Sequence, residues 1–127
     1  MIERPSALVV AVVDDDQSVL RSLEYLLESA DYAVRLFSSG KELLDSGCVP
    51  EIDCLISDVD MPGMEGYELL RAVRLSRPAL PVILITGYPG TQRGLAGHGD
   101  TPRCFTKPFA GPEFLAAVGE AIRKLRG

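Results

Sequence analysis

The sequence is poor in the residues that build zinc sites and disulfide scaffolds. It holds one histidine and three cysteines in 127 residues, and Cys48, Cys54 and Cys104 lack the close spacing of metal ligands. An odd number of scattered cysteines also argues against a disulfide framework and favours a reducing compartment. Cys54 and Cys104 lie in strand-like runs, and we therefore expect them to be free thiols that are buried in the core, where such side chains are common.

Long apolar runs and an excess of basic charge are also absent. The apolar run at residues 7–13 is much shorter than the ~20 residues of a membrane span, and three aspartates follow it rather than a cleavage site. The formal net charge is −5 and the isoelectric point is about 4.8, which argues against a nucleic-acid-binding surface. We expect a cytoplasmic protein that does not contact a membrane or nucleic acid and that binds proteins or cations.

The remaining composition is that of an ordinary globular domain. Apolar residues make up 46% of the chain and charged residues 24%, and the length suits a single domain over residues 1–127. Short apolar runs alternate with amphipathic segments almost throughout, which predicts an α/β fold with a parallel sheet covered by helices on both faces. The predicted strands are residues 7–13, 32–37, 54–57, 81–85 and 103–106.

Polar residues stand at the ends of four of these predicted strands. They are the aspartates at 14–16, Asp58, Thr86 and Lys107. Because the carboxyl ends of parallel strands form one ligand-binding edge, we expect carboxylates, a hydroxyl and an ammonium to meet there. Crowded carboxylates favour their protonated forms unless a cation intervenes, and oxygen ligands without histidine or cysteine indicate Mg²⁺.

Such a site is suited to phosphoryl transfer. A carboxylate beside Mg²⁺ can attack phosphorus and form an aspartyl phosphate. The metal and Lys107 can neutralise the phosphoryl oxygens, and Thr86 supplies a hydroxyl donor. Each residue alone has a simpler explanation, because aspartates also cap helices and begin turns. Only their co-occurrence favours the chemistry, and Asp16 is still best explained as a helix cap.

Four motifs in this sequence resemble those of the response-regulator receiver domains. In chain order they are Val12-Val13-Asp14-Asp15, Ile56-Ser57-Asp58-Val59-Asp60-Met61-Pro62-Gly63, Ile85-Thr86-Gly87 and Lys107-Pro108-Phe109. The resemblance extends from about Leu8 to Leu125. It implies a flavodoxin-like, doubly wound sheet of five parallel strands in the order 2-1-3-4-5, with helices on both faces.

The resemblance also implies a function and the residues that perform it. Asp58 is similar to the family's phosphoryl acceptor, Thr86 to its switch hydroxyl and Lys107 to the ammonium that pairs with the phosphoryl group. A sensor histidine kinase or a phosphotransfer protein would be the donor. The domain would catalyse only its own phosphorylation and dephosphorylation, and would signal to an unknown downstream protein or output domain through the surface around strands 4 and 5.

The expected Mg²⁺ ligands follow from the same resemblance. Asp15 is similar to the direct metal ligand, and Asp14 to the partner that acts mainly through metal-bound water. Asp58 itself and the backbone carbonyl of Asp60 complete the expected set. The chain fits either a stand-alone receiver or part of a longer regulator.

Two features depart from the family's pattern. The aromatic residue expected three places before the conserved lysine is replaced by Cys104, and Phe105 should point to the other face because side chains alternate along a strand. Tyr88 is a candidate substitute. Five glycines between Thr86 and Arg103, each costing about 1 kcal/mol in a helix, predict a short or irregular fourth helix. We expect residues 88–102 to be loosely ordered and to tighten on phosphorylation, and we place His98 in a loop there.

Two alternative functions account for part of the pattern. Asp58-Val59-Asp60 after an apolar strand resembles the nucleophile and acid of haloacid-dehalogenase-type phosphatases. However, Met61-Pro62 replaces the expected Thr or Val position, and the chain is short for that fold. A pseudo-receiver that binds partners without phosphoryl chemistry is the other alternative, although the full set of acidic, hydroxyl and lysine residues argues against it.

Overall fold

A computed structural model describes residues 8–60, 66–87, 103–107 and 110–126 of the protein. Its centre is a five-stranded sheet, in which the neighbouring strands pair in parallel in the order β2-β1-β3-β4-β5. The strands are β1 (Val9–Val13), β2 (Ala33–Phe37), β3 (Cys54–Asp58), β4 (Val82–Thr86) and β5 (Arg103–Thr106). The predicted α/β fold and its strand order are therefore confirmed.

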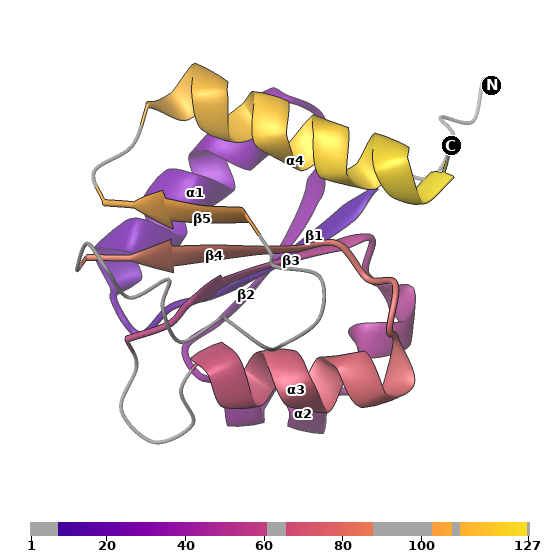
Figure 1. Ribbon diagram of the computed structural model, residues 1–127. Helices are drawn as coiled ribbons and strands as arrows, with labels where there is room; N and C mark the ends of the chain where they lie inside the picture. The colour runs from indigo at the N-terminus through magenta and orange to yellow at the C-terminus, as the bar shows by residue number, and fades with distance from the viewer. Residues whose placement is uncertain (1–7, 61–65, 88–102, 108–109, 127) are drawn as a thin grey trace, which may run out of the picture.

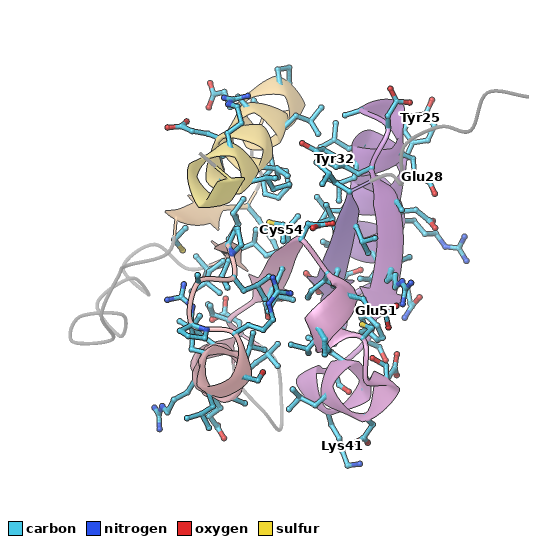
Figure 2. All side chains as sticks on the ribbon, turned by 90° about the vertical axis from the view of Figure 1, so that its right-hand side faces the viewer. Tyr25, Glu28, Tyr32, Lys41, Glu51 and Cys54 are labelled. Carbon is cyan, nitrogen blue, oxygen red and sulfur yellow. The ribbon has the colours of Figure 1, made fainter. Side chains whose placement is uncertain are left out.

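Helices cover both faces of the sheet, as Figures 1 and 2 show. Helices α1 (Gln17–Ser29) and α4 (Gly111–Arg126) lie on one face. Helices α2 (Gly40–Ser46) and α3 (Gly66–Ser76), with the 3₁₀ turn η1 (Val49–Glu51), lie on the other. None of the helices in the described residues has the length and apolar character needed to cross a membrane.

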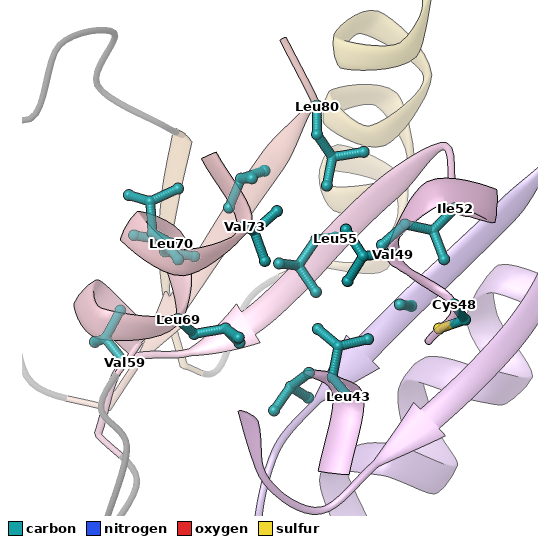
Figure 3. Packing of buried hydrophobic residues seen from close by; sticks show 14 residues of the cluster. Leu43, Cys48, Val49, Ile52, Leu55, Val59, Leu69, Leu70, Val73 and Leu80 are labelled. Atoms are coloured by element: carbon teal, nitrogen blue, oxygen red, sulfur yellow. The ribbon is translucent and has the colours of Figure 1, made fainter. Parts of the chain in front are cut away.

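A hydrophobic cluster fills the space on each face of the sheet. Leu23 of α1, Ile56 of β3 and Phe114 of α4 belong to one cluster. Leu43 of α2 and Val73 of α3 belong to the other, which Figure 3 shows. Every residue of β3 and β4 is buried, which explains why these strands read as continuous apolar runs rather than as alternating ones.

Local contacts fix where the first two helices begin. The Asp16 side chain accepts a hydrogen bond from the Ser18 backbone amide at 2.8 Å, so Asp16 is the N-cap of α1, as predicted. Ser39 caps α2 in the same way, by accepting from the Glu42 amide at 3.1 Å. The cap on α1 fixes the direction in which the chain leaves β1 and therefore the position of the aspartates between them.

The predicted offset in β5 is confirmed. Phe105 packs against Phe114 of α4, with ring centroids 5.2 Å apart in an edge-to-face arrangement, whereas Cys104 packs against the cluster on the opposite face. None of the three cysteines forms a disulfide; Cys48 and Cys54 are buried and Cys104 is partly buried. Burial raises the pKa of Cys54 to about 12, so this thiol stays protonated at neutral pH. Tyr88, His98 and the rest of residues 88–102 lie outside the described residues.

Candidate functional site

The carboxyl ends of the strands bring the predicted polar residues to one edge of the sheet. Asp14 follows β1, Asp58 and Thr86 end β3 and β4, and Lys107 follows β5. The parallel register places these ends side by side, since Asp58 pairs with Ile85 across β3 and β4. Asp14, Asp58 and Thr86 are all buried, with exposed fractions of 0%, 4% and 0%.

Lys107 joins the two buried carboxylates. Its Nζ donates to Asp14 Oδ2 and to Asp58 Oδ2, each at 3.1 Å. The backbone amide of Lys107 also donates to the Thr86 carbonyl at 2.7 Å, which holds the base of the lysine against β4. The ammonium is therefore positioned between two carboxylates that would otherwise repel each other in a poorly solvated place.

The pKa values of these groups reflect burial and pairing. Desolvation is the main cause of the raised pKa of Asp14; the negative charge of Asp58 adds to it, and contacts to Asp16 and Lys107 oppose it. For Lys107, desolvation is again the largest effect and lowers the pKa. The hydrogen bonds and charges of Asp58 and Asp14 together outweigh it and raise the pKa overall. Lys107 is therefore a cation at neutral pH.

Three carboxylates form a cluster that could bind a metal ion. One oxygen each from Asp14, Asp15 and Asp58 lies within 4.8 Å of the others. Asp15 is exposed while the other two are buried, so the cluster reaches from the interior to solvent. No histidine or cysteine belongs to this group in the described part of the chain. Such a set of oxygen donors fits a hard divalent cation.

Backbone amides hold the two buried carboxylates from the other side. The Asp16 amide donates to Asp14 Oδ1 at 2.9 Å, and the Asp60 amide donates to Asp58 Oδ1 at 2.8 Å. Each acid therefore receives one amide on Oδ1 and the lysine on Oδ2. These contacts fix the orientation of both carboxylates before any ligand arrives. Groups that are preorganised in this way can stabilise the charge that develops in a transition state.

Thr86 is connected to this cluster through Asp60. Its hydroxyl donates to Asp60 Oδ2 at 2.6 Å, and the Gly87 amide donates to the same oxygen at 3.2 Å. The sequence predicted a metal-ligating carbonyl at Asp60 and, in the phosphatase alternative, an acid there, but it did not predict this contact with Thr86. A carboxylate two residues after a strand-end aspartate was the one visible sign of it. The role of the Asp60 carbonyl as a metal ligand stays a prediction. The motif residues at 61–65 and 108–109 lie outside the described residues.

A pocket of about 580 Å³ opens beside the site, along α1. Its walls combine polar and apolar side chains of α1, and Lys107 and Gly111 also line it. Tyr25 lies on the outer side of α1 (Figure 2) and is 81% exposed.

Comparison with known proteins identifies the family. The model of the response regulator receiver domain matches residues 10–119, and the chain belongs to this family. It is 31% identical over 119 residues to the cell cycle response regulator CtrA of Brucella ovis, an alignment that covers 93% of this chain and 51% of CtrA. The chain thus spans about half the length of the curated relatives that it matches.

Solved structures are similar over almost the whole chain. The signal receiver domain of an HD domain-containing protein from Pseudomonas fluorescens Pf-5 superimposes with a TM-score of 0.86 at 25% identity, covering 95% of this chain and 98% of that one. The BeF₃-activated receiver domain of DrrB gives a TM-score of 0.81 at 28% identity, covering 93% and 99%. The fold is therefore that of the receiver domains of two-component signalling.

Proposed function

We propose that this receiver domain accepts a phosphoryl group on Asp58 in a Mg²⁺-dependent reaction, from a sensor histidine kinase or a phosphotransfer protein. The observation that carries the proposal is the Asp58 carboxylate, buried at the sheet edge with the Lys107 ammonium 3.1 Å from Oδ2. Asp14 and Asp15 lie in the same cluster. A nucleophile, a cation and a metal-binding set are thus within reach of one phosphoryl group.

In the proposed reaction an oxygen of Asp58 attacks phosphorus and the bond from phosphorus to the donor breaks. The electron pair of that bond leaves with the donor. Lys107, held charged by its two acidic neighbours, offers positive charge to the phosphoryl oxygens. Bound Mg²⁺, held by Asp14, Asp15, Asp58 and the Asp60 carbonyl, would neutralise the negative charge of the acids and of the phosphoryl group. Thr86 then donates its hydroxyl to a phosphoryl oxygen.

The donor protein would approach along α1. The pocket beside α1 is continuous with Lys107, so a partner seated there would bring its phosphorylated side chain to the sheet edge. We propose that the domain is a cytoplasmic signalling module, with no turnover of a free substrate. Its output would be a change of the surface around β4 and β5 that a downstream protein or output domain reads. The net charge of −5 favours protein partners over nucleic acid.

A phosphatase of the haloacid-dehalogenase type would need Asp60 to act as a free acid beside Asp58. The Asp60 carboxylate instead accepts hydrogen bonds from Thr86 and Gly87. Only the backbone amide of Asp60 contacts the Asp58 carboxylate. The site therefore favours a stable acyl phosphate over rapid turnover of phosphomonoesters.

The test is phosphorylation by acetyl phosphate in the presence of Mg²⁺, read by intact mass. Wild type should gain one phosphoryl group, and Asp58→Asn should gain none. Asp45→Asn is the matched control, because Asp45 is exposed and pairs with Lys41 on α2, away from the sheet edge; it should behave like wild type. If wild type gains nothing from acetyl phosphate or from a phosphorylated phosphotransfer protein, the proposal is wrong and a pseudo-receiver is favoured.

A further inference from the structure

The Asp60 side chain makes a contact that the proposed reaction does not use. Its Oδ2 atom accepts both the Thr86 hydroxyl at 2.6 Å and the Gly87 amide at 3.2 Å. Asp60 follows β3 and is exposed, whereas Thr86 ends β4 and is fully buried. A short hydrogen bond from a hydroxyl to a carboxylate is among the stronger ones that neutral donors make. This contact joins two segments that are 26 positions apart in the chain.

The hydroxyl of Thr86 cannot serve two acceptors at once. A threonine hydroxyl carries one proton and therefore donates one hydrogen bond at a time. In the structure that proton is directed at Asp60, while the proposed reaction needs it at a phosphoryl oxygen on Asp58. Asp60 and the phosphoryl group are both anions beside the same strand ends, so they also repel each other. The two contacts of Thr86 are mutually exclusive.

Gly87 extends the consequence to the next residue of the chain. Its amide shares the same carboxylate oxygen, so loss of the Thr86 contact also weakens the hold on the Gly87 backbone. The aromatic ring that would pass on a threonine movement is absent from the β5 position, since Cys104 stands there and Phe105 packs against Phe114 on the other face. The Gly87 backbone is therefore one described route by which a movement of Thr86 can leave the site, and the Lys107 amide on the Thr86 carbonyl is another.

We propose that the Asp60 carboxylate is a latch, which holds the Thr86 hydroxyl and the Gly87 amide in the unphosphorylated protein and must be displaced before Thr86 can bind the phosphoryl group. This inference rests on the proposed function, because it concerns the regulation of the same site. Asp60 is a positioning residue: it acts through Thr86 and sets how readily the phosphorylated state replaces the resting one. Removing the latch should therefore favour the activated state.

The resting contact is tested first, without any phosphoryl chemistry. Amide hydrogen exchange and the NMR shift of Gly87 are compared in wild type, Asp60→Asn and Asp60→Ala, without phosphodonor. Asp60→Ala should exchange the Gly87 amide faster, on the order of tenfold, and Asp60→Asn should show a smaller change because its amide oxygen still accepts. An unchanged Gly87 amide in Asp60→Ala would mean that the latch does not exist in solution.

The regulatory effect is measured with beryllofluoride and Mg²⁺ as the probe of the activated state. Asp60→Ala should bind this probe about tenfold more tightly than wild type, and Asp60→Asn should show a smaller gain because its amide oxygen still accepts from Thr86. Asp16→Asn is the matched control, because it removes an exposed aspartate charge close to the site, while asparagine caps a helix as well as aspartate does. If Asp16→Asn gains the same affinity for beryllofluoride, the effect comes from net charge and the latch proposal is wrong.

A double-mutant cycle separates the latch from simple repulsion. In the Thr86→Val background no hydroxyl is left to release, so Asp60→Asn should lose most of its gain in beryllofluoride affinity. The same gain with and without the hydroxyl would show that Asp60 acts by repulsion alone. If wild type fails to bind beryllofluoride at all, the proposed function has failed instead, and the Gly87 exchange measurement still decides whether the latch exists.

Discussion

Asp14 and Asp58 are almost fully buried where they meet Lys107, whereas Asp60, which meets Thr86 at the end of the neighbouring strand, is exposed. Both contacts join a carboxylate to a donor from another segment, and both lie at the carboxyl edge of the sheet. They differ in how costly they are to break. A buried charge that loses its partner destabilises the fold strongly, whereas an exposed carboxylate that loses a donor is solvated by water.

This difference assigns different tasks to the two parts of the site. The buried group of Asp14, Asp58 and Lys107 is fixed by amides on one side and by the ammonium on the other. It is therefore suited to chemistry, which needs groups that do not move. The contact between Asp60 and Thr86 has one solvated partner and can be exchanged for another at small cost. It is therefore suited to reporting the reaction.

The largest effect should come from Lys107→Met, which removes the cation from the buried group. The initial rate of Asp58 phosphorylation by acetyl phosphate with Mg²⁺, followed by intact mass, should fall roughly 10²-fold, because a preorganised positive charge is lost from the transition state. Lys41→Met is the control, since Lys41 is exposed and pairs only with Asp45 in the described structure. If both variants react at the wild-type rate, Lys107 has a structural role only.

A smaller effect should separate Asp15 from its neighbour Asp16. Both are exposed, but only Asp15 belongs to the carboxylate cluster, while Asp16 caps α1. Asp15→Asn should lower the Mg²⁺ affinity at least about tenfold, since even residues that merely orient a metal's ligands contribute that much. Asp16→Asn should leave it nearly unchanged, as titration calorimetry with Mg²⁺ would show. Equal losses would mean that net charge, and not ligation, sets the affinity.

The buried part of the site was predictable from the sequence because it follows from strand topology. Once short apolar runs alternate with helices, the residues at the strand ends must meet at one edge, and Asp14, Asp58 and Lys107 do so. The orientation of Phe105 also followed, because side chains alternate along β5. These inferences need only periodicity and order, which a sequence displays directly.

The contact between Asp60 and Thr86 was not predictable in the same way. It depends on the direction in which the chain leaves β3, and no periodicity fixes the path of an irregular segment. The dual pairing of Lys107 was equally invisible, since a long lysine side chain has many rotamers and only the packed structure selects one. Sequence patterns therefore locate strand-end residues, but not which of them exchange hydrogen bonds.

The smallest effect is a change in stability at Asp14, measured in metal-free protein. Burial raises the pKa of this carboxyl above its ordinary value of 3.8. A carboxyl with a raised folded-state pKa stabilises the fold when it is protonated. That contribution is complete below pH 3.8 and is lost as the pH rises through the folded-state pKa. At neutral pH the buried negative charge of Asp14 therefore destabilises the folded state. The free energy of unfolding of Asp14→Asn should exceed that of wild type by on the order of 1 kcal/mol.

Urea unfolding in EDTA at several pH values would check two things: whether Asp14→Asn is more stable than wild type, and over which pH range the difference disappears. The advantage of Asp14→Asn should shrink as the pH is lowered toward 3.8. Excess Mg²⁺ should reverse the order, because a ligand that binds only the folded wild-type site adds its binding free energy to stability. A variant less stable than wild type in EDTA at pH 7 would show that Lys107 more than offsets desolvation. In that case the buried carboxylates would stabilise the fold even without a metal ion. They would not be a site whose charge repulsion destabilises the fold until a cation binds.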